Sequence, residues 1–234
     1  MPSVLVPLAP GCEELEAVTV IDLLRRANIN VITAGLDDQP VKASRGVMLI
    51  PDATLDEALQ QDFDMVVLPG GLPGADHLNN DSRIRQLLQK MQQQGHYTAA
   101  ICAAPKVLAD AGLLANKSAT SYPGVLDKMN IPQMQFINAP VVKDGSVITS
   151  RGPGTAMDFA LTLVETLVGR EVRDQVEASL TIMRPCYCPR LTSRILAIIF
   201  DIEKISVLCN IVGSIFQGRY NCENDTPRHA KSLW

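Results

Sequence analysis

The chain has 234 residues, of which 47% are hydrophobic and 20% charged, and these values are typical of a globular domain. Its formal net charge of −4 and pI near 5.4 argue against nucleic acid or an anionic membrane surface as the main partner. Because the N-terminus has neither a basic segment nor a long apolar run, we expect a cytoplasmic protein whose six cysteines are thiols.

The first part of the chain alternates apolar strands with amphipathic helices. We predict strands over 3–9, 30–36, 47–50 and 63–68, and helices that open at 11–14 and cover 55–59 and 84–93. The first helix ends near Arg25 and Arg26, where positive charge suits the helix dipole. Its buried face is predicted from apolar residues at helical spacing, namely Leu15, Val18, Ile21 and Leu24.

The pattern continues through the middle of the chain. We predict strands over 97–101, 118–121 and 147–149, and helices over 106–114 and from Ala156 to Leu167. Strands that alternate with helices predict an α/β fold, with a mainly parallel sheet and helices on both faces. Reactive sites in such sheets lie beyond the C-terminal strand edge, so the loops 11–16, 69–74 and 102–105 should converge there.

Cys102 is the first candidate for a catalytic residue. It follows an apolar strand and precedes Ala103, Ala104 and Pro105, which predicts a sharp turn between a strand and a helix. A cysteine at a helix N-terminus is exposed to the positive end of the dipole, which favours the thiolate and hence a nucleophile. A cysteine that only packs in the core is the alternative interpretation.

Charge and cysteine usage change near residue 180. Residues 181–234 have a net charge of +3 and four of the six cysteines, whereas residues 1–180 have a net charge of −7. We therefore predict an α/β domain over 1–180 and a C-terminal extension over 181–234. The extension's apolar stretches, 195–200 and 205–216, are shorter than the roughly 18 residues that a transmembrane helix requires.

An amphipathic helix is one interpretation of this extension, and an aberrant C-terminal exon that folds poorly is another. Its cysteines lack a known zinc spacing, so we expect no metal site; they are Cys186, Cys188, Cys209 and Cys222.

Four segments together resemble the ThiJ/PfpI (DJ-one) superfamily, in the branch of the parkinsonism-associated protein deglycase and its close bacterial relatives. They are 11–16 (GCEELE), 68–71 (LPGG), 99–105 (AAICAAP) and 149–155 (TSRGPGT). The resemblance covers residues 3 to about 180. It implies a flavodoxin-like sandwich, a homodimer, and a cysteine that oxidises readily to sulfinate.

The resemblance also implies an activity. Members act without a cofactor as glyoxalases of the lyase type on methylglyoxal and glyoxal, and as deglycases (hydrolases) of early glycation adducts. These reactions protect against carbonyl and oxidative stress. A redox-sensing chaperone with an oxidisable cysteine and little turnover is the alternative. A Cys-His peptidase is a third possibility, disfavoured because the chain has three histidines and none follows Cys102 directly.

The family's functional residues transfer to matching positions of this sequence. Cys102 corresponds to the nucleophile and Glu16 to its protonated acidic partner. The oxyanion site corresponds to backbone groups in two loops, at Gly70, Gly71 and Ala103. Residues around the pocket or dimer face correspond to Arg45, Arg151 and Asp22, of which Asp22 approaches the partner's site.

Simpler interpretations exist for the charged members of this set. Glu16 could be a solvated acid at a helix start, and the arginines and Asp22 could be ordinary surface residues. One position departs from the family, because Tyr122 stands where some relatives have histidine. A phenol can donate a hydrogen bond, but it is a poor base at neutral pH.

Overall fold

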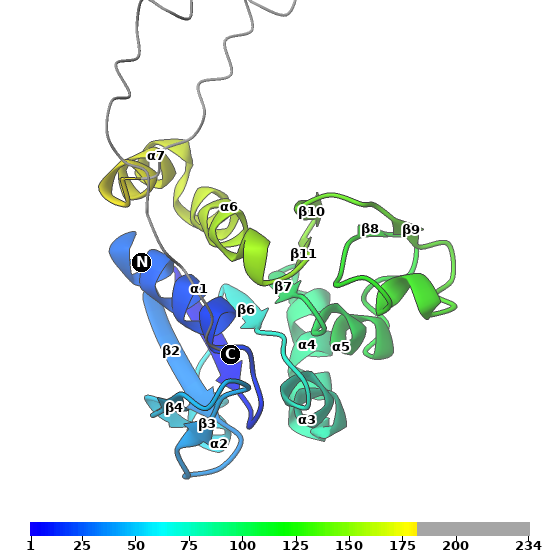
Figure 1. The fold of residues 1–234 in the computed structure, drawn as a ribbon, viewed down its shortest axis with the longest axis horizontal. Coiled ribbons are helices and arrows are strands. Elements are labelled where there is room, and N and C mark those ends of the chain that lie inside the picture. Colours follow the sequence, from blue (N-terminus) through cyan, green and yellow to red (C-terminus); the bar gives the residue numbers. More distant parts are fainter. Residues whose placement is uncertain (182–234) are drawn as a thin grey trace, which may run out of the picture. The chain divides into compact units, whose positions relative to one another are not determined.

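A seven-stranded sheet lies at the centre of the computed structural model, which describes residues 1–181 (Figure 1). Its strands, in spatial order, are β10 (Val141–Asp144), β11 (Val147–Ser150), β7 (Tyr97–Ile101), β6 (Met65–Leu68), β1 (Ser3–Leu8), β2 (Asn30–Gly35) and β5 (Ala53–Thr54). All neighbours pair in parallel except β10 and β11, which form an antiparallel hairpin at one edge. The predicted α/β fold with a mainly parallel sheet is therefore confirmed.

Helices cover both faces of this sheet, as predicted (Figure 1). On one face α1 (Glu14–Arg26) packs against α6 (Ala156–Val168), which contacts α7 (Arg170–Ser179). The other face carries α3 (Gly74–Asn80), α4 (Ser82–Gln94) and α5 (Pro105–Asp110), while the short α2 (Leu55–Ala58) packs near β2 and β5. Among residues 1–181, no helix has the length and apolarity needed to cross a membrane.

Several short elements lie outside the main sheet. The predicted strand over 47–50 is β4 (Met48–Leu49), paired only with β3 (Val41–Lys42). The predicted strand over 118–121 is β8 (Ser118–Ala119), which pairs with β9 (Gln135–Phe136) and not with the central sheet. Two 3₁₀ turns, 126–128 and 153–155, complete the fold. The predicted extension, with its helix and four cysteines, lies outside the described residues except for Thr181.

The prediction for the buried face of α1 was wrong in part. Leu15 and Val18 are 51% and 48% exposed. The buried residues are Glu16, Ala17, Val20, Leu23 and Leu24. Apolar residues occur around much of this helix, so periodicity alone does not select one face. Ala17 and Val20 face the interior. Leu15 and Val18 form an apolar stripe on the outer surface of the helix.

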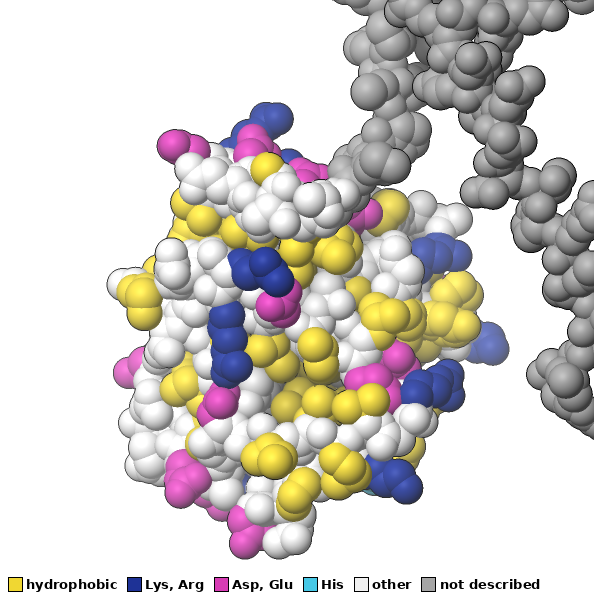
Figure 2. All heavy atoms as spheres, turned by 60° about the vertical axis from the view of Figure 1, so that its left-hand side comes forward, with side chains coloured by type: hydrophobic (Ala, Val, Ile, Leu, Met, Phe, Trp, Pro, Cys, Tyr) yellow, Lys and Arg dark blue, Asp and Glu magenta, His cyan; other side chains and the backbone are white. Residues whose placement is uncertain are grey.

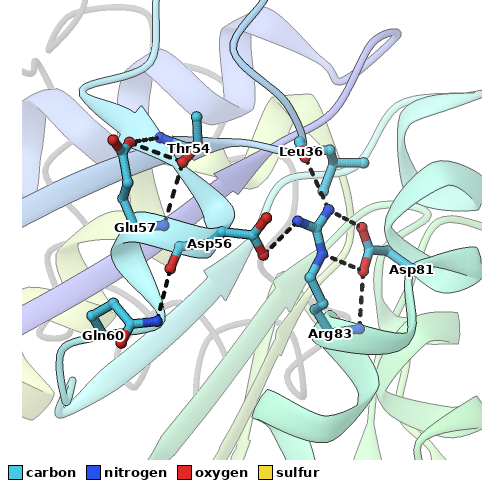
Figure 3. Close-up of polar contacts among 7 residues, drawn as sticks. All are labelled: Leu36, Thr54, Asp56, Glu57, Gln60, Asp81 and Arg83. Carbon is cyan, nitrogen blue, oxygen red and sulfur yellow. Dashed lines mark hydrogen bonds and ion pairs between the residues drawn. The ribbon is translucent and has the colours of Figure 1, made fainter.

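Arg83 connects three segments on one side of the sheet (Figure 3). Its guanidinium donates to the Leu36 carbonyl after β2 at 2.9 Å and to the Asp56 carboxylate of α2 at 2.8 Å. It also bonds Asp81, the N-cap of α4, at 2.6 Å, and this bond lowers the pKa of the Asp81 carboxyl. The Asp56 partner is well exposed, so we expect Leu36 and Asp81 to carry most of the stabilisation.

Replacing Arg83 should therefore weaken the fold. We expect Arg83→Lys to lower the free energy of unfolding by about 1 kcal/mol, because a single ammonium cannot reproduce the forked geometry that reaches three acceptors. Chemical denaturation measures this change. Arg85→Lys, two residues along the same helix, is the matched control and should stay within about 0.5 kcal/mol of wild type. Equal stability of the two variants would contradict the linking role of Arg83.

Candidate active site

Three loops that follow β1, β6 and β7 meet at the C-terminal edge of the sheet, as the sequence predicted. The Glu13 N–H donates to the Gly70 carbonyl at 2.9 Å, which joins the first two loops. The Gly70 N–H donates to the Glu16 carboxylate at 2.9 Å. The Cys102 carbonyl accepts from the Tyr122 N–H at 2.8 Å, which brings a fourth segment beside the elbow. Parallel strands place these loops at one edge because they all run in the same direction.

Cys102 occupies the predicted turn between β7 and α5. Its φ of +63° lies in the left-handed region that L residues rarely adopt. Cys102 is 9% exposed and lines a cavity, so the residue is nearly enclosed but accessible from that cavity. The backbone N–H groups of Gly71 and Ala103 donate toward this sulfur and act to lower the thiol pKa. The predicted backbone donors therefore lie at the Cys102 sulfur.

Glycine is required at the neighbouring loop because the backbone approaches the site closely. A Cβ at Gly70 would lie 2.6 Å from the Cys102 Cβ and 2.8 Å from Glu16 Oε2. Gly71 has a φ of +89°, which glycine adopts without strain. The Gly70-Gly71 pair thus allows the acid, the thiol and the N–H donors to share one small space.

Glu16 is fully buried, so the interpretation as a solvated helix residue was wrong. Its Oε2 accepts from the Gly70 N–H, whereas Oε1 is buried without a hydrogen-bond partner among residues 1–181. Burial raises the pKa of Glu16 to about 7. This value suits a group that gives and takes protons at neutral pH.

Glu16 and Cys102 form a coupled pair. The pKa of the Cys102 thiol is raised to about 12, chiefly by burial and then by the negative charge of Glu16, with which the thiol also forms a hydrogen bond. The expectation of a lowered thiol pKa was therefore wrong for the site with a charged Glu16. The helix that follows the cysteine has only six residues, and burial outweighs its dipole. Between these two pKa values the pair holds one proton, on the thiol, and below about 7 Glu16 is protonated as well.

Cys102 lines a cavity of about 400 Å³. The predicted residues Arg45 and Tyr122 line it together with Cys102, Gly71 and Ala103. Sequence reasoning missed the other lining residues, which are Glu13, Ser44, Leu72, Val125 and Pro153. Glu13 had a signal, because it lies inside the acidic segment at the start of α1. Pro153 lies in the 149–155 segment and Leu72 in the 69–74 loop, whereas Ser44 and Val125 come from loops that carry no motif of their own.

Two further predicted residues lie outside this cavity. Arg151 lines an adjoining hollow, which it shares with Tyr122. Asp22 is exposed on α1 and pairs with Arg26 at 2.7 Å, so it does not reach the site of its own chain. The i, i+4 spacing of a helical ion pair explains this contact without a catalytic role.

Ser44 joins the acidic start of α1 to the loop that carries Arg45. Its hydroxyl lies 2.7 Å from Glu13 Oε2 and 2.9 Å from Glu14 Oε2. Glu14 also accepts from the Arg45 N–H at 2.8 Å. One hydroxyl has one proton, so it donates to one carboxylate at a time. These bonds hold the 44–47 loop over the cavity.

Comparisons with known proteins show what this chain is similar to. A model of the DJ-1/PfpI family matches residues 2–166. The chain is 45% identical over 181 residues to Protein dj-1beta of Drosophila melanogaster, which covers 77% of this chain and 97% of that protein. The crystal structure of the same fly protein gives a TM-score of 0.75 and covers 78% of this chain and 99% of that one.

Two other relatives bear on the chemistry. The chain is 39% identical over 170 residues to the glutathione-independent glyoxalase DJR-1.2 of Caenorhabditis elegans, covering 72% of this chain and 90% of that protein. The structure of oxidized Toxoplasma gondii DJ-1 gives a TM-score of 0.75 at 35% identity, covering 79% of this chain and 100% of that one. The flavodoxin-like fold implied by the sequence resemblance is therefore confirmed.

Proposed function

Because this chain belongs to the DJ-1/PfpI family, we propose that it is a cofactor-independent glyoxalase and protein deglycase with Cys102 as its nucleophile. The observation that carries the proposal is the contact between the Cys102 thiol and the buried Glu16 carboxyl, with two backbone N–H groups directed at the sulfur. A relative named as a glutathione-independent glyoxalase supports the same reaction class.

The first step is addition to the aldehyde of methylglyoxal. Glu16 accepts the thiol proton while Cys102 Sγ forms a bond to the aldehyde carbon, and the carbonyl electron pair moves to oxygen. The N–H groups of Gly71 and Ala103 stabilise that oxyanion. Loss of one such donor in other enzymes raises the barrier by roughly 3–4 kcal/mol. Glu16 then gives this proton to the oxyanion, so the product is a neutral hemithioacetal on Cys102 and Glu16 is a carboxylate again.

The second step is an internal redox exchange between adjacent carbons. Glu16 removes the proton from the sulfur-bearing carbon, which is oxidised as the electron pair moves toward the ketone carbon. Glu16 gives this proton to the former ketone carbon, and the hydroxyl proton of the sulfur-bearing carbon moves to the former ketone oxygen. The former ketone carbon is thereby reduced to an alcohol, and the sulfur-bearing carbon becomes the carbonyl of a thioester. The resulting lactoyl thioester is hydrolysed by water, which releases lactate and restores the thiol. Hemithioacetal and aminocarbinol adducts of glycated molecules present the same type of carbon to the same groups.

This proposal has a direct test. The purified full chain, incubated with methylglyoxal and no glutathione, should form lactate detectable by NMR. Absence of lactate under these conditions would contradict the proposed activity.

A second candidate function is redox sensing with chaperone activity. The N–H groups at Cys102 could hold the oxygens of a sulfinate, and one relative was solved in an oxidized form. The raised thiol pKa disfavours rapid oxidation, and this places sensing second. Mild peroxide followed by mass spectrometry decides the matter, because a sensor should show stoichiometric sulfinate at Cys102 and suppress aggregation only in that state.

The outer surface of α1 supports a homodimer. Leu15 and Val18 on α1 are exposed. They lie beside the 44–47 loop, which is bonded to Glu14 of the same helix, and Met48 and Ile50 after this loop are exposed as well. Figure 2 shows hydrophobic side chains reaching the surface on the side that lies to the left in Figure 1. An apolar stripe of this kind is typical of a face that another copy covers. We propose a cytoplasmic homodimer joined through α1.

Val18→Asp should dissociate such a dimer, because the interface would have to bury an unpaired carboxylate. We expect the dissociation constant to rise about 100-fold or more, measured by sedimentation velocity over a concentration series. Ile137→Asp, at an exposed apolar residue away from α1, is the control and should leave the dimer intact. A wild-type chain that is monomeric at every concentration would refute the assignment.

A further inference from the structure

The cavity over Cys102 continues into a second hollow. This hollow has a volume of about 270 Å³, and its lining includes Arg151, Gly152 and Thr155. Tyr122 and Pro153 line both spaces, so the two are adjacent along a common wall. The Cys102 cavity alone falls in the size range of pockets that hold drug-sized ligands. Methylglyoxal, with three carbons, leaves most of this space unfilled.

Arg151 places an unpaired positive charge at the far end of this groove. It is half-buried, and its backbone N–H donates to the Pro140 carbonyl. Its guanidinium has no ion-pair or hydrogen-bond partner in the part of the chain that the structure describes. By contrast, Arg25, Arg26 and Arg83 each pair with an aspartate at 2.6–2.8 Å. A guanidinium without a protein partner, on a half-buried residue, is suited to a carboxylate or phosphate from a ligand.

Tyr122 forms the surface between the thiol and Arg151. Its backbone N–H is bonded to the Cys102 carbonyl, which holds its position relative to the nucleophile. The ring lies over Gly152, where an added Cβ would be 3.3 Å from Tyr122 Cδ2. The side chain is 51% exposed, so the ring offers an apolar surface to a ligand that spans both hollows.

The Cys102 cavity itself has the reverse charge preference, because a carboxylate lines it. Glu13 lines the cavity and accepts a hydrogen bond from Ser44. A carboxylate there repels an anionic substrate group, whereas Arg151 attracts it. The positive charge of Arg45 opposes the effect of Glu13. Because Arg45 is exposed to solvent, its charge is screened and the difference in charge between the Glu13 and Arg151 regions remains. The charges therefore orient an anionic substrate with its charged end toward Arg151.

We propose that the groove from Cys102 over Tyr122 to Arg151 selects oxoaldehydes and glycation adducts that carry an anionic group beyond the reacting carbonyl. Arg151 binds the carboxylate or phosphate, and Tyr122 packs on the atoms between. This inference rests on the proposed glyoxalase and deglycase activity, because it names the substrate class of the same site.

The phosphate arm of the test is kinetic. Hydroxypyruvaldehyde and its phosphate ester differ only in the anionic group, so the ratio of their kcat/KM values isolates its contribution. We expect the wild-type ratio to favour the phosphate by about tenfold, and Arg151→Gln to bring the ratio close to one. Arg85→Gln, an exposed arginine that lines neither hollow, should keep the wild-type ratio.

The carboxylate arm is an equilibrium measurement that needs no turnover. S-acetonyl-N-acetylcysteine is a thioether without an aldehyde, and its amide lacks the charge. Calorimetric titration should show about tenfold tighter binding of the acid by wild type, a preference that falls at high salt and is lost in Arg151→Gln. If wild type prefers only the phosphate or only the carboxylate, the result identifies which anionic group the groove selects.

The outcomes separate the two proposals. Turnover of both oxoaldehydes without any anion preference overturns the subsite and leaves the proposed function standing. No turnover, with a binding preference that depends on Arg151, overturns the proposed function and supports the subsite. A preference that persists in Arg151→Gln overturns the assignment to Arg151.

Discussion

Cys102→Ala should lower kcat/KM for methylglyoxal by about 10³-fold or more, because no other group can form the covalent hemithioacetal. The thiol is the one nucleophile of the described residues that lies in the cavity beside both Glu16 and two backbone N–H groups. Alanine fits the space, since it removes one atom from an enclosed side chain. Lactate formation, followed over time without glutathione, measures the effect.

Cys12→Ala is the matched control for this substitution. Cys12 is also buried and free, and burial raises the pKa of its thiol to about 11. It does not line the cavity, so its replacement should leave turnover within about twofold of wild type. Full turnover by Cys102→Ala would contradict the proposed mechanism. Equal losses in both variants would indicate a folding defect, which circular dichroism detects.

Glu16→Gln should lower kcat/KM by roughly 10²–10⁴-fold, because an amide can neither accept the thiol proton nor carry a proton between carbons. The amide keeps the shape of the carboxyl and can still accept from the Gly70 N–H. Glu165→Gln, at an exposed position on α6, is the matched control and should retain activity. Activity of Glu16→Gln near that of wild type would remove the proton-transfer role.

The same pair predicts a pH profile. In the proposed mechanism Glu16 must be a carboxylate to accept the thiol proton, so a site in which both groups are protonated is inactive. Because burial raises the pKa of Glu16 to about 7, wild-type kcat/KM should rise as pH passes through about 7. The small residual activity of Glu16→Gln should lack this rise. A wild-type profile that is flat between pH 6 and 8 would contradict the coupled pair.

Glu16 should also make the fold less stable as pH rises. Its pKa is about 7 in the folded chain and near 4.5 when exposed, so its protonated form favours folding below pH 4.5. That stabilisation is lost as pH rises through 7, and the shift corresponds to roughly 3 kcal/mol. Denaturation at pH 5 and 8 should show this loss in wild type and a smaller one in Glu16→Gln.

The strands and the loops of the candidate site could be predicted from local patterns. A strand buried on both faces is a continuous apolar run, as in 65–68 and 97–101, and the small residues after Cys102 permit a sharp turn. Parallel strands then bring their following loops to one edge, so the meeting of Glu16, Gly70 and Cys102 follows from their positions in the chain. The family resemblance supplied the roles of these residues.

The rest depended on packing between distant segments. The orientation of α1 could not be read from a helix with apolar residues on more than one side, and docking on α6 turned Leu15 and Val18 outward. Ser44 reaches Glu13 across 31 positions, and Tyr122 meets Arg151 only where two loops fold together. Packing between distant segments also decided that the pKa of the Cys102 thiol is raised and not lowered. Dipoles follow from local sequence, but desolvation depends on every atom that surrounds the sulfur.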